Sequence, residues 1–219
     1  MKSLFTGGAL VLATLSFAVD KWDFEYSDGV YTHAVGTGAP GGYTSQLLSS
    51  ITDLTHSMRL TRTSGAAWDM AGPDTLGNAG LLPASWGRGC FDPFARETVN
   101  DYMQAEFLSA TYGSVSIDFG DFGGDIDNIV LEAWSSVGGS LLATATYNNY
   151  NFATVTPLTS VTVTVTSNSP IGMVRFRGGD ANFPNSMYMD NIVAGPVPEP
   201  ATFVALGGGI ALLARRKRK

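Results

Sequence analysis

The sequence has few of the residues on which most nucleophilic and redox sites depend. Its 219 residues include one cysteine, Cys90, and two histidines, His33 and His56. A single cysteine excludes an intramolecular disulfide, and the Gly-x-Ser-x-Gly pattern of a nucleophile elbow is absent. Among the 19 acidic residues, no pair is marked out for the hydrolysis of a glycan. We therefore expect a non-catalytic protein, and a secreted glycan-active hydrolase is the alternative.

Charge is also sparse, at 15% of the chain, and it is unevenly distributed. Residues 19–200 hold all 19 acidic side chains but only seven of the 13 basic ones, which leaves this stretch with a net charge of −12. Such an acidic body disfavours nucleic acid as a partner, because the phosphates of nucleic acid are negative as well. The remaining basic residues lie at the two ends of the chain.

The apolar run at the N-terminus is too short to span a bilayer comfortably. Lys2 precedes a mostly apolar stretch from Leu4 to Phe17, and small residues lie just before Val19. This layout is typical of a secretory signal peptide. We expect residues 1–18 to direct export through the Sec translocon and to be cleaved between Ala18 and Val19.

The C-terminus carries a second short apolar run, which ends in a basic cluster. The run from Ala201 to Ala214 has no charge and measures about 21 Å as a helix, against roughly 30 Å for a hydrocarbon core. With flanking side chains that reach the headgroups, a segment over about residues 198–214 would cross a thin inner membrane. The positive-inside rule would keep five residues on the cytoplasmic side: Arg215, Arg216, Lys217, Arg218 and Lys219.

Taken together, the final segment "PVPEPATFVALGGGIALLARRKRK" resembles the PEP-CTERM sorting tail of exported bacterial proteins. The resemblance covers residues 196–219, and its motif consists of Val197, Pro198, Glu199 and Pro200. It implies transient anchoring in the inner membrane and recognition by an exosortase-type membrane peptidase. It also implies release to the cell surface or to an extracellular polysaccharide matrix of a Gram-negative bacterium. The same tail is also called an ice-binding protein C-terminal domain, a label that need not describe the body.

The body, residues 19–195, shows no sustained helical period but many segments that alternate with period two. The alternation directs the valines of Val161–Thr166 toward a core, and directs Arg175 and Arg177 outward. Other strands are expected over residues 22–26, 57–61, 105–110, 114–119, 128–134, 140–147 and 187–193. Short strands separated by glycine-rich turns predict an all-β protein, a two-sheet β-sandwich. Residues 62–104 are rich in glycine and proline and are expected to form an irregular, functional insertion.

The stretch from "SVSIDFGDFGGDIDNIVLEAW" to "NSMYMDNIVAG" resembles jelly-roll domains that look like carbohydrate-binding modules and lectin-like sandwiches. This resemblance covers about residues 106–194. It implies that the last strand lies beside the first strand, around Phe24. It also implies a structural Ca²⁺ between these strands, held by Asp23 or Glu25 together with Asp190.

A second candidate calcium site is the acidic strand end and turn that contain Asp118, Asp121, Asp125 and Asp127. Ca²⁺ takes six to eight oxygen ligands in flexible geometry, which an aspartate-rich loop can supply. The spacing is not that of an EF-hand loop. A solvated acidic turn is the alternative, because ordinary turns also favour aspartate.

Sugar binding requires flat aromatic rings against the C–H face of a pyranose. Trp86 is the favoured candidate because it lies in a glycine-rich loop, and Trp134 and Tyr150 are the others. For each of them the alternative is a place in the core, where most tryptophans of a sandwich lie. Outward rows of threonine leave ice binding or adhesion as a minor alternative, although solvent-facing strands favour threonine anyway.

Overall fold

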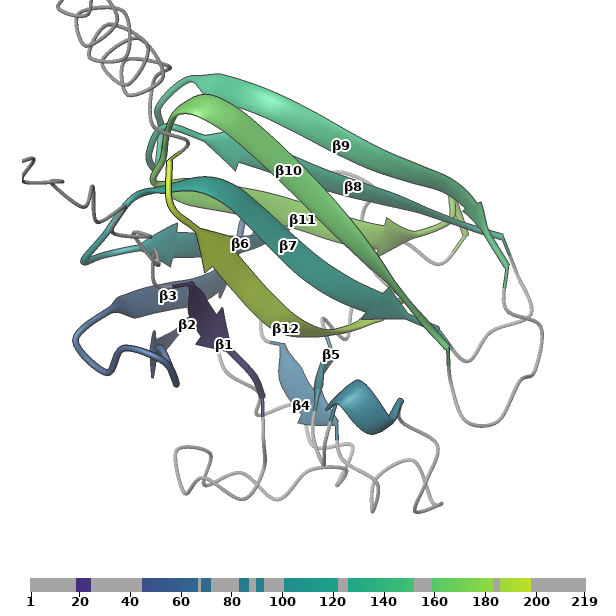
Figure 1. The fold of residues 1–219 in the computed structure, drawn as a ribbon. Helices are drawn as coiled ribbons and strands as arrows, with labels where there is room; N and C mark the ends of the chain where they lie inside the picture. The colour runs from purple at the N-terminus through teal and green to yellow at the C-terminus, as the bar shows by residue number, and fades with distance from the viewer. Residues whose placement is uncertain are drawn as a thin grey trace, which may run out of the picture.

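The computed structural model describes residues 19–24, 45–66, 68–71, 83–86, 90–92, 101–121, 126–151, 159–182 and 186–197. These residues form two six-stranded sheets whose strand pairs are antiparallel, together with one short 3₁₀ turn (Figure 1). The expected all-β, two-sheet architecture is therefore confirmed. Within these ranges no helix is long and apolar enough to cross a membrane. The expected signal peptide and C-terminal membrane segment lie outside the described residues.

The first sheet has the strand order β10–β7–β12–β5–β4, and β1 also pairs with β12. Its strands are β1 (Asp20–Trp22), β4 (Asp69–Ala71), β5 (Cys90–Asp92), β7 (Tyr112–Gly120), β10 (Ser160–Ile171) and β12 (Tyr188–Gly195). On β12, Met189 pairs with β5, whereas Ile192 to Ala194 pair with β1. Because β7 occupies the other edge of β12, β5 and β1 follow one another along the same edge.

The second sheet has the order β2–β3–β6–β11–β8–β9. Its strands are β2 (Ser45–Ser49), β3 (Ser57–Arg62), β6 (Met103–Phe107), β8 (Asp127–Trp134), β9 (Leu141–Tyr150) and β11 (Met173–Gly179). The expected strands are found with shifted ends, and β2, β4 and β5 were not expected. Within residues 62–104, the structure describes β4, the 3₁₀ turn η2 (Ala84–Trp86) and β5.

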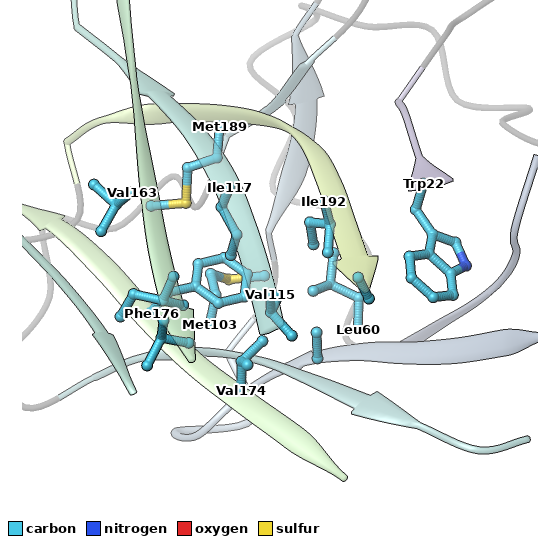
Figure 2. Packing of buried hydrophobic residues seen from close by; sticks show 14 of the residues in the cluster. Trp22, Leu60, Met103, Val115, Ile117, Val163, Val174, Phe176, Met189 and Ile192 are labelled. Atoms are coloured by element: carbon cyan, nitrogen blue, oxygen red, sulfur yellow. The ribbon is translucent and has the colours of Figure 1, made fainter. Parts of the chain in front are cut away.

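The core lies between the inner faces of the two sheets, and period-two alternation explains its composition. Val163 and Val165 of β10 are buried while the threonines between them are exposed. Figure 2 shows side chains of both sheets meeting, among them Ile117 from β7 and Phe176 from β11. Arg175 and Arg177 lie on the outer face, as the alternation predicted.

The first and last strands lie side by side, as the jelly-roll resemblance implied. In this antiparallel pair, Asp20 lies opposite Ala194 and Trp22 opposite Ile192. With three residues, β1 forms few ladder hydrogen bonds, so its side chains must contribute much of its stability. The Trp22 ring lies 5.6 Å from the ring of Phe107, between centroids, and is fully buried.

Candidate functional site

A buried carboxylate lies where β12 passes from β5 to β1. The side chain of Asp190 is 0% exposed, and its Oδ1 accepts a hydrogen bond from the backbone N–H of Phe24 at 3.1 Å. Its Oδ2 is buried and has no hydrogen-bond partner within the described ranges. Burial, reinforced by the negative charge of Asp23, raises the pKa of Asp190 to about 8. A carboxylate in this setting favours either a proton or a bound cation.

Asp23 supplies a second carboxylate near Asp190. Among the residues that the structure describes, its buried Oδ1 has no hydrogen-bond partner, and its Oδ2 lies 3.5 Å from Nζ of Lys21. The structure thus brings together two of the residues that the sequence predicted for calcium, while Glu25 lies outside the described residues. No three His, Cys, Asp or Glu side chains of the described ranges gather around one point as metal ligands would. Any Ca²⁺ held by Asp23 and Asp190 would need further oxygens from carbonyl groups, water or Glu25.

A β-bulge accounts for the inward position of Asp190. The register of β12 against β7 shifts between Asp190 and Val193, and Asn191 has a positive φ of 51°. Asparagine tolerates this left-handed conformation better than most residues do. The Asn191 amide donates hydrogen bonds of 3.0 Å to Asp118 and to the carbonyl of Ser85. The bulge therefore attaches η2 to the first sheet.

The structure describes only part of the acidic turn. Asp121 and Asp127 are both buried and lie near Tyr150, whose pKa is raised, mainly by burial and further by these two charges. Asp118 instead accepts a hydrogen bond from Thr162. The structure thus places Asp121 and Asp127 around one tyrosine, and Asp125 lies outside the described residues.

Only one of the three aromatic candidates presents itself to solvent. Trp86 and Tyr150 are 0% and 1% exposed, so a sugar has no access to either ring, and the structure does not favour a ligand role for them. Trp134 alternates with the buried Ala133 and lies half-buried on the outer face of the second sheet. It is the candidate that remains accessible.

Trp134 is part of a cluster that we call the arginine–aromatic face. The guanidinium carbon of Arg175 lies 4.7 Å from the centroid of the Trp134 ring, and that of Arg177 lies 4.9 Å from the Tyr102 ring. The Trp134 Nε1–H donates to Glu132 at 3.0 Å, and the Arg175 Nε–H donates to Gln104 at 3.2 Å. The face comprises Tyr102, Gln104, Glu132, Trp134, Arg175 and Arg177.

Strand register creates this face. Arg175 of β11 pairs with Gln104 of β6 on one side and with Glu132 of β8 on the other. Each arginine stacks on a neighbouring ring, which fixes flat, hydrogen-bonding groups in half-buried positions. The sequence indicated that both arginines point outward, but Tyr102 was missed because no local pattern relates it to Arg177.

A second cluster that the sequence did not reveal surrounds Asp20. The Asp20 Oδ2 accepts a hydrogen bond from the Tyr112 hydroxyl at 2.7 Å and lies 2.7 Å from Nδ1 of His56. Burial alone would raise the pKa of Asp20, but hydrogen bonds from Tyr112, His56 and Ser50 outweigh burial and lower it. The cluster attaches β1 to β7 and to the connection between β2 and β3.

The end of β12 leads directly into a segment that a comparison with known families identifies. Residues 196–219 match the model of the PEP-CTERM protein-sorting motif. This match confirms the resemblance of the tail. The motif implies export, processing by exosortase, which is a membrane protein, and transient sorting at the membrane to the cell surface. No curated protein and no solved structure matches the chain, so the jelly-roll resemblance of the body gains no support there.

The PEP-CTERM motif begins directly after the folded body. β12 ends at Gly195, and the described residues continue only to Val197, so Pro198, Glu199 and Pro200 lie outside them. Because Ala194 pairs with Asp20, the motif leaves the body beside Val19, the expected first residue of the mature chain.

Proposed function

We propose that this chain is an exported, exosortase-sorted protein of the cell surface or extracellular matrix of a Gram-negative bacterium, non-catalytic and associated with polysaccharide. One observation carries the proposal: the PEP-CTERM motif follows the last strand of an all-β body without an intervening linker. The apolar run of the motif would anchor the chain in the inner membrane until exosortase cleaves it. The five basic residues from Arg215 to Lys219 would keep the end of the tail in the cytoplasm.

The arginine–aromatic face is the surface that best fits a polysaccharide. Indole and phenol rings pack against the apolar face of a sugar ring, and guanidinium groups donate to hydroxyls and bind carboxylates in a forked geometry. Of the arginines in the described ranges, Arg62 is buried and Arg59 is paired with Glu106 outside this face, whereas Arg175 and Arg177 belong to it. In a body with a net charge of −11, the two arginines of this face outnumber its one acidic residue, Glu132, which favours polysaccharides that carry acidic groups.

A binding experiment with the chain released from cells tests this role. We expect Trp134→Ala and Arg175→Ala each to weaken retention on the polysaccharide of the producing bacterium at least tenfold. The matched controls are Tyr147→Ala, an exposed ring on β9, and Arg59→Ala, an exposed arginine on β3; both should stay within twofold of the unaltered chain. Equal retention by all four variants would contradict a role for the arginine–aromatic face.

The same incubation separates the binding protein from the alternative, a hydrolase on a β-sandwich. Retention without release of shorter glycans supports the binding protein, and release of reducing ends supports the hydrolase. Loss of product release in a variant of one surface carboxylate would then identify the catalytic group.

Calcium is proposed as a structural ion between β1 and β12. Asp23 and Asp190 together offer two buried oxygens for which the described part of the chain supplies no hydrogen-bond partner, which suits a hard cation. Glu25 is a further candidate ligand from the sequence, and the turn with Asp121, Asp125 and Asp127 is a second candidate site. Such an ion would hold the short first strand against the last one.

A further inference from the structure

Several connections of the two sheets meet at the end of the sandwich where β12 finishes. The backbone N–H of Leu108, after β6, donates to the carbonyl of Ser57 at 2.9 Å. The N–H of Gly172 donates to the carbonyl of Trp134 at 3.0 Å, just before the turn between β8 and β9. The N–H of Ile51 donates to β1 at Lys21. These bonds join residues 50–57, 108–111 and 135–140 into one end surface beside Val19 and Gly195.

This end surface carries aliphatic side chains that are unusually exposed. Leu54 is 78% exposed, the largest fraction among the exposed large hydrophobic residues of the described ranges. Of the nine such residues there, six lie on this end surface or directly beside it, and together they form what we call the terminal rim: Val19, Ile51, Leu54, Leu108, Val137 and Leu141. Single exposed leucines need no explanation, but six gathered at one end indicate a surface that something apolar covers.

The length of the chain beyond β12 indicates what covers it. Gly195 ends β12, and the apolar run of the tail begins at Ala201. Five intervening residues, three of them proline, extend at most about 20 Å. A chain anchored by that run therefore holds the terminal rim close to the headgroups of the bilayer.

The charges of the rim agree with an apolar rather than an ionic contact. Residues 50–57, 108–111 and 135–140 contain no lysine or arginine, and their ionisable groups are Asp53 and His56. Attraction to anionic headgroups would require basic residues, whereas shallow insertion of aliphatic side chains does not.

We propose that the terminal rim rests on the lipid surface of the membrane, with Leu54, Leu108 and their neighbours inserted at the headgroup level, while the tail is anchored. This inference rests on the proposed anchoring of the PEP-CTERM tail. The body then stands on the bilayer on one defined end and presents the bond that exosortase cleaves at the membrane surface.

Lipid-borne quenching tests the contact on the full, uncleaved chain. The protein would be purified from the membranes of a host without exosortase and reconstituted in vesicles of phosphatidylethanolamine and phosphatidylglycerol. In a Cys90→Ser background, Leu54→Cys or Leu108→Cys carries an environment-sensitive fluorophore. The matched control is Ile126→Cys, 50% exposed but located at the opposite end of β8. We expect nitroxide lipids to quench the rim positions at least threefold more strongly than the control.

A fourth label, at Val204→Cys in the apolar run, distinguishes a failure of the rim contact from a failure of the tail anchor. Strong quenching there together with equal, weak quenching at Leu54, Leu108 and Ile126 overturns the rim contact but leaves the anchor intact. Absence of quenching at Val204 overturns the anchor, and the rim contact with it. If the fluorophore at Leu54→Cys becomes shielded from solvent only after exosortase is added, the rim contacts a protein surface. That result overturns the lipid contact.

Discussion

At the scale of single residues, Asp190 shows how a strand irregularity creates chemistry. The bulge at Asn191 directs a carboxylate into the interior, where Oδ1 accepts a hydrogen bond from Phe24 and Oδ2 has no hydrogen-bond partner among the described residues. Desolvation at such a position penalises the charged form more than the two backbone donors, Asn191 and Phe24, can offset. Asp190 is therefore the residue at which bound calcium and bound protons would compete.

The first prediction concerns Asp190 and pH. Its pKa is about 8 in the folded protein and 3.8 in an ordinary peptide, so between these values only the folded state holds the proton. The free energy of unfolding should therefore fall as pH rises, by about 1.4 kcal/mol per unit, or roughly 4 kcal/mol between pH 4 and pH 7 without calcium. Thermal unfolding in chelator at several pH values measures this slope.

Calcium should reverse that loss, because it stabilises the ionised form. We expect added Ca²⁺ to raise the melting temperature more at pH 8 than at pH 5. Asp190→Asn should abolish both the dependence of stability on pH and its dependence on Ca²⁺. Asp180→Asn, a half-buried aspartate just after β11, is the matched control and should keep them. If a chelator has no effect on the melting temperature at pH 8, the proposed ion is ruled out. If stability does not change with pH, protonation of Asp190 in the folded protein is ruled out as well.

A second prediction at this scale compares two ion pairs of β3. Arg62 and Asp101 form a buried pair, 1% and 2% exposed, and Asp101 also accepts hydrogen bonds from Thr63 and Ser64. The neighbouring pair of Arg59 with Glu106, at 3.2 Å, is largely exposed. Arg62→Ala leaves a buried carboxylate without its counter-charge and should cost about 3–5 kcal/mol.

Arg59→Ala is the control and should cost about 1 kcal/mol or less, because solvent screens the exposed pair. Unfolding in urea, monitored by tryptophan fluorescence, gives both values. Equal losses in the two variants would show that burial does not distinguish the pairs.

At the scale of elements, β1 depends on contacts that its length does not provide. Three residues pair with β12, and Asp20 contributes bonds to Tyr112 and His56 while Trp22 packs against Phe107. Since β1 directly follows the expected signal cleavage site, these contacts would fix the mature N-terminus to the sandwich.

The Tyr112 hydroxyl provides the third prediction. Tyr112→Phe keeps the ring but removes one hydrogen bond that lowers the pKa of Asp20, at a cost of about 1–3 kcal/mol at neutral pH. Because the folded pKa of Asp20 is depressed, this stabilisation is present above the ordinary value near 4 and is lost as pH falls below it.

The loss in the free energy of unfolding caused by Tyr112→Phe should therefore be largest at pH 7 and smaller in acid. Hydrogen exchange of the β1 amides and urea unfolding at both pH values measure it. Tyr147→Phe, whose ring is exposed on β9, serves as the control and should change neither. Unaltered exchange in β1 of the Tyr112→Phe protein would show that the cluster does not hold this strand.

The elements also show what the sequence could predict. Period-two alternation located β7, β10 and β11 and oriented Val163 and Arg175 correctly, because one face of each strand is buried. It could not find β4 and β5, because three residues are too few to show a period.

The candidate site was harder to predict, because it joins distant segments. Asp190 and Phe24 are 166 positions apart, and only the jelly-roll resemblance placed them side by side. Trp86, which was favoured because it lies in a glycine-rich loop, is buried. The composition of that loop could not show that the fold covers this ring. Tyr102 was missed because its partner Arg177 lies on a strand that only register brings close.

At the scale of the whole molecule, the two ends of the described body, Val19 and Gly195, lie at one end of the sandwich. Asp20 pairs with Ala194, so the chain enters and leaves the folded body at adjacent positions on β1 and β12. The PEP-CTERM motif begins one residue after β12, and the arginine–aromatic face lies on the outer surface of the other sheet. The proposed sorting and binding roles would thus use separate surfaces, and substitutions could alter one without the other.

The measurement that tests the central claim most directly is the fate of the tail in a bacterium that has exosortase. The unaltered chain would be compared with a variant in which Pro198, Glu199 and Pro200 are replaced by alanine, by intact-mass analysis of membrane and surface fractions. We expect the unaltered chain at the cell surface without its basic end, and the variant in the membrane at full length. Identical location and mass of the two proteins would contradict the account.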